Sequence, residues 1–171
     1  MIRSEKKLKE LNILLKGNNS EKIIKAVNLL RDEEPFTGAV EALVLHYDST
    51  GDNTVQDSIS DFFNDLKDPS VREEVMAQIM ASVKPSTLQM LLSSCWQSGL
   101  DYSAYATDLA GIFVTADLPA AIECMTVIEE SASGITESHK EGILSLLDGI
   151  MESGDPAKVA LAGELALILR Q

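Results

Sequence analysis

The sequence is poor in the residues that usually carry metal, redox or disulfide chemistry. Its 171 residues include two cysteines, Cys95 and Cys124, and two histidines, His46 and His139. Two cysteines cannot form the disulfide framework of a small secreted domain, and their apolar neighbours predict buried thiols, with a redox or metal role as the alternative. Neither histidine belongs to a His-Glu-x-x-His motif. We therefore expect no metal and no cofactor.

Long apolar runs are also missing. No stretch approaches the roughly 18 apolar residues of a membrane-spanning helix. Residues 1–16 space their leucines among Lys and Glu, unlike a secretory signal. We expect a soluble, cytoplasmic protein that does not bind membranes. The alternative for the first helix is a membrane-surface helix, which is disfavoured because Glu5 and Glu10 dilute its positive charge.

Positive charge is scarce beyond the first helices. Eight of the 14 Lys and Arg residues lie within residues 1–31, and none occurs in residues 32–65 or 85–139. The net charge is −13. An anionic body of this kind repels nucleic-acid phosphates, so we expect no binding to DNA or RNA.

Signatures of catalysis are absent from the sequence. It contains no Gly-x-Ser-x-Gly elbow, no Gly-x-x-x-x-Gly-Lys phosphate loop and no Gly-x-Gly-x-x-Gly run. The segment 48–59 is only superficially similar to a calcium loop, because Asn53 and Ile59 occupy the positions that require Gly and Glu. We predict no enzymatic activity and no catalytic, cofactor-binding or metal-binding residues.

What the sequence does contain is a repeated helical pattern, seen when the segments that begin at Ser20, Asn53 and Ser86 are aligned. The apolar columns are Ala26/Ile59/Leu92, Leu29/Phe62/Cys95, Leu30/Phe63/Trp96, Leu43/Met76/Leu109, Val44/Ala77/Ala110, His46/Ile79/Ile112 and Tyr47/Met80/Phe113. A period of about 33 residues is typical of stacked helical hairpins, which bury their apolar faces against one another. We expect Phe63 and Trp96 to be equivalent and buried; a binding hot spot of Trp96, Tyr102 and Tyr105 is the alternative.

The pattern predicts about ten helices and no strand. The first spans 4–16, and the next pair as 20–30 with 36–47, 54–66 with 69–83, 86–97 with 102–116 and 119–130 with 136–152, before a last helix at 156–169. Asp68, Asp117 and Asp155 are expected to cap helix starts, each with a proline close behind. The link at 131–134 is predicted to be a loop, with a hinge as the alternative.

Two turns carry a family resemblance. The run Leu66-Lys67-Asp68-Pro69-Ser70-Val71-Arg72-Glu73-Glu74-Val75 resembles the turn within a HEAT repeat, and residues 154–160 are similar. The resemblance to HEAT and armadillo repeats implies an all-α, right-handed α–α superhelix of about five helical hairpins. It would be a single domain over 1–171, with a capping helix at 1–17 and repeats over 20–171, and a monomer.

A ladder of acids follows the period. Glu41 and Glu74 are separated by one full period, as are Asp108 and Glu141, which lie one position out of phase with the first two. We expect all four to face solvent, and the resemblance implies that they line an acidic concave surface; an ordinary solvated face is the alternative. The predicted function is a non-catalytic interaction or scaffold module that binds a partner protein or basic peptide there. The alternatives are an enzyme or enzyme accessory on a HEAT-like scaffold, and an acidic inhibitor that imitates nucleic acid.

Overall fold

The structure is a computed structural model that describes residues 1–17, 19–81, 84–153 and 155–171. Within these ranges the chain forms ten α-helices and three short 3-10 helices, and its one strand-like pairing is an isolated bridge between Ile2 and Phe36. The predicted all-α class is confirmed. In the same ranges, no helix combines the length and the apolar character needed to span a bilayer.

The chain divides into two compact units, residues Met1–Leu100 and Asp101–Gln171. The first contains α1 (Glu5–Leu15), α2 (Ser20–Leu30), α3 (Ala39–Ser49), α4 (Asn53–Asn64), η1 (Pro69–Val71), α5 (Arg72–Met80) and α6 (Pro85–Gln97). The second contains η2 (Ser103–Tyr105), α7 (Ala106–Thr115), α8 (Leu118–Glu130), η3 (Ala132–Gly134), α9 (Glu137–Ser153) and α10 (Pro156–Leu169). The expectation of a single domain stays a prediction.

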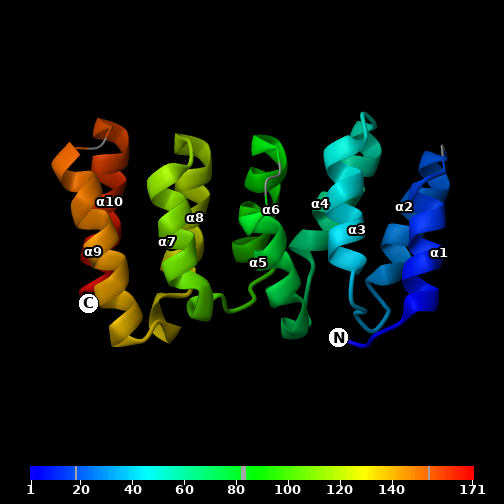
Figure 1. Ribbon diagram of the computed structural model, residues 1–171, viewed down its shortest axis with the longest axis horizontal. Helices are drawn as coiled ribbons and strands as arrows, with labels where there is room; N and C mark the ends of the chain where they lie inside the picture. Colours follow the sequence, from blue (N-terminus) through cyan, green and yellow to red (C-terminus); the bar gives the residue numbers. More distant parts are fainter. Residues whose placement is uncertain (18, 82–83, 154) are drawn as a thin grey trace. The chain divides into compact units, whose positions relative to one another are not determined.

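Within the first unit, consecutive helices form hairpins that pack in two layers (Figure 1). Helices α1, α3 and α5 follow one another in one layer, and α2, α4 and α6 in the other. Short connections join α1 to α2, α3 to α4 and α5 to α6, so the pairing starts one helix earlier than expected. The first helix is therefore half of a hairpin and packs against both α2 and α3.

The second unit repeats this arrangement with four helices. Helix α7 packs against α8 and α9, and α10 packs against α8 and α9. Its core contains Tyr102, Leu109, Phe113, Cys124, Ile128, Ile143, Leu147 and Leu165. The predicted loop at 131–134 holds η3, which contacts η2, and Ser131 accepts a hydrogen bond from the Tyr102 backbone N–H at 3.3 Å.

The buried positions of the first unit recur with a shorter period than the one used to align the repeats in the sequence. The two periods differ by one residue. Buried residues of the even layer follow one another as Ile23, Val55 and Thr87, and as Val27, Ile59 and Leu91. One residue turns a helix by about 100°. The sequence alignment therefore mixes inward and outward positions: Leu29 is 54% exposed, Met80 60% and Trp96 38%. The prediction that Trp96 is buried like Phe63 is wrong.

Most helix starts follow the expected capping chemistry. Asp68 accepts a hydrogen bond from Ser70 N at 2.8 Å, Asp117 from Ala120 N at 3.1 Å and Asp155 from Ala157 N at 2.8 Å. Helix α3 starts later than predicted, at Ala39, because Phe36 pairs with Ile2 and Gly38 adopts a left-handed φ of 88°. The predicted helix end at residue 83 and the turn residue 154 lie outside the described residues.

Candidate binding hollow in the first unit

A cavity of about 350 Å³ opens beside the connection between α2 and α3 and the corner between α4 and α5. We call it the Phe36 hollow. It is lined by Met1, Leu30, Arg31, Asp32, Glu33, Glu34, Pro35, Phe36, Ala39, Val40, Phe62, Asp65, Leu66, Lys67, Asp68 and Val71. All of these residues belong to the first unit.

The floor of the hollow is apolar. Buried side chains form it: Phe36 and Leu66 from two connections, Phe62 from α4 and Val71 from η1. Phe62 also packs edge-on against the core residue Phe63, with ring centroids 5.5 Å apart. Such a floor favours an apolar group of a ligand, because removing that group from water is the main gain in a site of this kind.

Backbone hydrogen bonds fix the connection that carries Phe36. Ile2 N donates to Pro35 O at 2.9 Å, and Thr37 N donates to Ile2 O at 3.0 Å. These two bonds form the isolated bridge that places Phe36 against the core. The segment before α1 thus holds Phe36 in place, although Phe36 lies in a connection rather than in a helix.

The rim of the hollow is acidic. Five acids, Asp32, Glu33, Glu34, Asp65 and Asp68, share it with two basic residues, Arg31 and Lys67. Acidic side chains on the rim therefore outnumber basic ones by five to two, and the N-terminal ammonium group of Met1 lies near Asp68. The backbone N–H of Ser70 donates to Asp68 and lowers the pKa of its carboxyl group below the ordinary value of 3.8.

The basic residues near the rim are already engaged. Arg31 pairs with Asp65, and Lys67 Nζ donates to Ser98 O at 3.3 Å. No ion pair involves Asp32 or Glu34 within the part of the chain that the structure describes. Two carboxylates therefore border the apolar opening outside any ion pair of the described residues.

Lys7 shows which chemistry this region accepts. Its Nζ lies 2.8 Å from Glu33 Oε2 and 5.6 Å from the centroid of the Phe36 ring. A cation is attracted both by the carboxylate and by the negative face of an aromatic ring. An ammonium or guanidinium group of a ligand can use the same combination of acids and aromatic surface.

Each of the two units contains two of the four ladder acids. Glu41 is exposed on α3, and Glu74 is half-buried on the neighbouring α5. Asp108 and Glu141 are exposed on α7 and α9 of the second unit. Whether the four share one surface stays a prediction. The expectation that all four face solvent is wrong for Glu74, which is half-buried.

Glu74 has a structural contact. Its Oε1 accepts a hydrogen bond from Gly38 N at 2.9 Å, at the N-terminus of α3, and its buried Oε2 has no hydrogen-bond partner among the described residues. The free N–H groups and the dipole at a helix start attract a carboxylate. Glu74 thus links α5 to α3, and its replacement would change stability as well as surface charge.

Several other singled-out residues have structural surroundings. Tyr102 is buried, so it does not contribute to a surface hot spot, and Tyr105 is half-buried. His46 is half-buried with Nε2 lacking a partner among the described residues, and burial lowers its pKa. His139 is half-buried too. Over the ranges that the structure covers, no group of three or more His, Cys, Asp or Glu side chains is placed to hold a metal ion.

Sequence reasoning missed the Phe36 hollow, although a signal was available. The acidic run 32–34 precedes Pro35-Phe36, and one period after Asp32 another acid, Asp65, precedes Asp68-Pro69. The same connection in two successive repeats therefore carries acids next to apolar residues. Stacking of the repeats brings these two connections together.

Comparison with known protein families, curated proteins and solved structures gives no match. The resemblance to HEAT repeats therefore rests on the sequence of the two Asp-Pro turns alone.

Proposed function

We propose that the protein is a non-catalytic interaction module that binds a basic segment of a partner protein at the Phe36 hollow. The observation that carries this proposal is an apolar floor beneath a rim on which Asp32 and Glu34 form no ion pair with any described residue. A ligand that fits both features carries an apolar side chain flanked by Lys or Arg. Burial of the apolar group contributes binding free energy, and the basic residues speed the association and orient the ligand.

The scaffold in this proposal is a HEAT-like right-handed solenoid in a cytoplasmic setting. Within each unit, odd-numbered helices pack against odd-numbered ones and even-numbered helices against even-numbered ones. This packing supports a stack of hairpins. Two buried cysteine thiols, one in each unit, fit a reducing compartment. Of the predicted ladder, the exposed acids Glu41 in the first unit and Asp108 and Glu141 in the second would each add negative charge to the surface of their own unit.

The test uses a labelled peptide, Lys-Lys-Phe-Lys-Lys, as the probe. The variant Asp32→Lys/Glu34→Lys reverses the two unpaired rim charges. Glu129→Lys/Glu130→Lys makes the same change in net charge at two exposed acids of α8 in the second unit. We expect the rim variant to weaken binding by about tenfold or more, equivalent to about 1.4 kcal/mol, and the control variant to have little effect.

Two further probes separate the floor from the rim. Lys-Lys-Gly-Lys-Lys keeps the charges without the apolar anchor, and Glu-Glu-Phe-Glu-Glu keeps the anchor with reversed charges. Both should bind more weakly than the first probe, and amide chemical shifts of Phe36, Leu66 and Val71 should respond to it alone. Equal losses in the rim and control variants, or equal binding of the glycine probe, would contradict a specific site.

A further inference from the structure

The outer sides of α1 and α2 repeat one pattern of exposed residues. Lys6, Lys9 and Ile13 on α1 have the same spacing as Lys22, Lys25 and Leu29 on α2. All six are exposed, and we call this surface the lysine face. Positions i, i+3 and i+7 lie on one side of a helix, so each helix presents two ammonium groups and one aliphatic side chain in a stripe.

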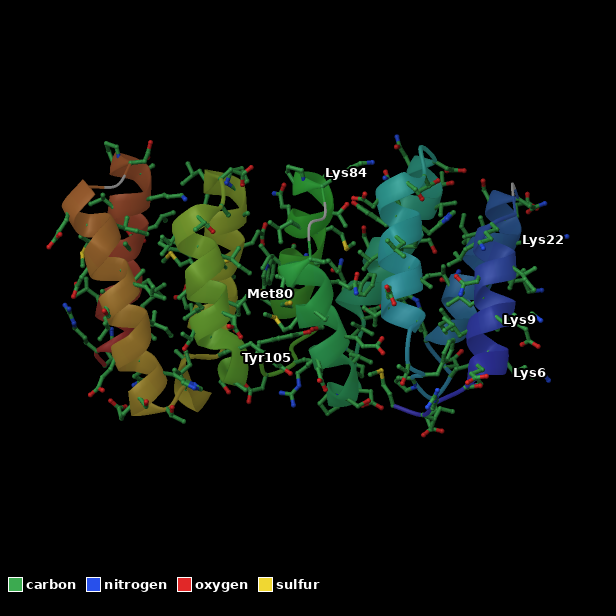
Figure 2. All side chains as sticks on the ribbon, viewed as in Figure 1. Lys6, Lys9, Lys22, Met80, Lys84 and Tyr105 are labelled. Atoms are coloured by element: carbon green, nitrogen blue, oxygen red, sulfur yellow. The ribbon has the colours of Figure 1, made fainter. Side chains whose placement is uncertain are left out.

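The lysine face points away from the rest of its unit. Helix α1 packs against α2 and α3, and α2 packs against α4, on their other sides. Figure 2 shows Lys6, Lys9 and Lys22 directed outward, on the side opposite α3 and α4. Ile13 is 62% exposed, which is a large fraction for an aliphatic side chain. A shallow depression beside Leu29 is lined by Glu21, Ile24, Lys25, Asn28, Leu29 and Asp32.

Most of the charge on the lysine face is uncompensated. Lys9, Lys22 and Lys25 form no ion pair with any described residue, and Lys6 lies 4.0 Å from Glu10 with both side chains exposed. An exposed pair of this kind contributes little and is easily exchanged. The same two helices also expose Glu5, Glu10 and Glu21. With five Lys against three Glu, α1 and α2 still have a net positive charge in a chain of net charge −13.

The outer sides of α9 and α10 carry the opposite charge. Glu141, Asp148 and Glu152 are exposed on α9, and Glu164 and Leu167 are exposed on α10. We call these five residues the carboxylate face. Its four acids form no ion pair with any described residue, and Leu167 is 65% exposed. The packing contacts of α9 with α7, and of α10 with α8, lie on the other sides of these helices.

We propose that the lysine face of one copy of this chain docks on the carboxylate face of a second copy. Four lysines meet four carboxylates, and Leu167 meets the apolar side chains of Ile24 and Leu29 in the shallow depression. The contact joins two different surfaces, so each added copy keeps a free face of each kind and the association continues head to tail. This goes beyond the binding of a basic segment at the Phe36 hollow and replaces the expectation of a monomer.

The proposal is tested by sedimentation velocity with two complementary variants. Lys22→Glu/Leu29→Glu removes the lysine face, and Glu164→Lys/Leu167→Lys removes the carboxylate face. Every substituted residue is exposed, so both variants should keep the helical circular dichroism spectrum of the wild type. The wild type should grow in mass with concentration, and less so at high salt, because salt screens exposed charges.

Mixing the variants identifies the geometry. Each variant alone should stay monomeric, because every copy lacks one of the two surfaces. An equimolar mixture should form dimers and nothing longer, since only one intact lysine face and one intact carboxylate face remain per pair. Glu129→Lys, which changes an exposed acid outside both faces, should associate like the wild type.

Three results would overturn the proposal. The first is a wild-type chain that remains monomeric at low salt and high concentration. The second is a variant that still associates alone as the wild type does, which would place the contact elsewhere. The third is a mixture that stays monomeric although the wild type associates.

Discussion

Phe63 is wholly buried in the first unit, where it packs against Phe62 near the C-terminal end of α4. Replacement of Phe63 by Ala removes a large side chain from a packed site, so the free energy of unfolding should fall by about 3–5 kcal/mol. Trp96→Ala should cost less, below about 2 kcal/mol, because part of the indole is already in water. Urea unfolding of the two variants gives both values. Equal losses would place Trp96 in the core after all.

Asp52 makes the stability of α4 dependent on pH at the acidic end. It accepts hydrogen bonds from the hydroxyls of Ser20 and Thr54, which lower its pKa from the ordinary value of 3.8 to about 2. Because the folded state holds the carboxylate ionised more strongly than the unfolded state, its contribution is complete above pH 3.8 and is lost as the pH falls toward 2.

The variant Asp52→Asn tests this dependence, because Asn can still cap a helix but does not titrate. It should lose less stability than the wild type between about pH 4 and pH 2, measured by urea unfolding. Asp57→Asn, on the exposed side of the same helix, should keep the acid dependence of the wild type. An unchanged acid dependence in Asp52→Asn would assign the effect to other carboxylates.

The errors at the residue scale have one cause. An alignment shifted by a single position still places an apolar residue in nearly every column, because buried helices carry apolar residues at several adjacent positions. Leu29 and Trp96 are apolar and therefore fit the shifted alignment, although they face outward. Sequence patterning identifies which helices have a buried side more securely than it identifies the residue at the centre of that side.

At the scale of the elements, the start of α3 is tightly constrained. A Cβ atom added to Gly38 would lie 2.9 Å from Leu8 Cδ2 on α1, and φ at this position is 88°. Gly99 has a similar φ of 71°, but a Cβ there would meet nothing within 4 Å. Gly99→Ala should thus cost about 1–2 kcal/mol of stability from the backbone alone. Gly38→Ala should cost about 1 kcal/mol more, because Leu8 must move.

Thermal or urea unfolding of these two glycine variants measures how strongly α1 is packed against α3. If both variants lose the same stability, the contact between Leu8 and Gly38 is loose and only backbone conformation matters. If Gly38→Ala loses more, a nuclear Overhauser map should show Leu8 displaced. The cost of a positive φ is common to both variants, so the difference between their losses of stability reports the contact between Leu8 and residue 38.

The helices themselves could be predicted well because most of them have a periodic apolar face, and because capping residues such as Asp117 and Asp155 mark several of their starts. The last helix, for example, has the expected bounds Pro156–Leu169. The Phe36 hollow could not be predicted in the same way. Its walls come from connections such as 31–36 and 65–69, where no periodic pattern exists, and its geometry depends on the pairing of Ile2 with Phe36.

The charge distribution of the whole molecule predicts poor binding to nucleic acid. A net charge of −13 leaves few cations to release counterions from phosphates, and the basic residues are concentrated in the first 31 positions. We expect no binding to a random DNA duplex at roughly micromolar protein and about 150 mM salt, measured by fluorescence anisotropy. Binding under these conditions that disappears in Lys22→Glu/Leu29→Glu would instead assign nucleic acid to the lysine face.

The two buried thiols make the cooperativity of the chain measurable without any substitution. Cys95 lies in the first unit and Cys124 in the second, and each reacts with an alkylating reagent only when its surroundings open. Alkylation rates at low urea, resolved by peptide mass spectrometry, should rise in parallel if the chain opens as one foldon. If one thiol reacts well before the other, each unit opens on its own, and a partner bound to one would protect that thiol alone.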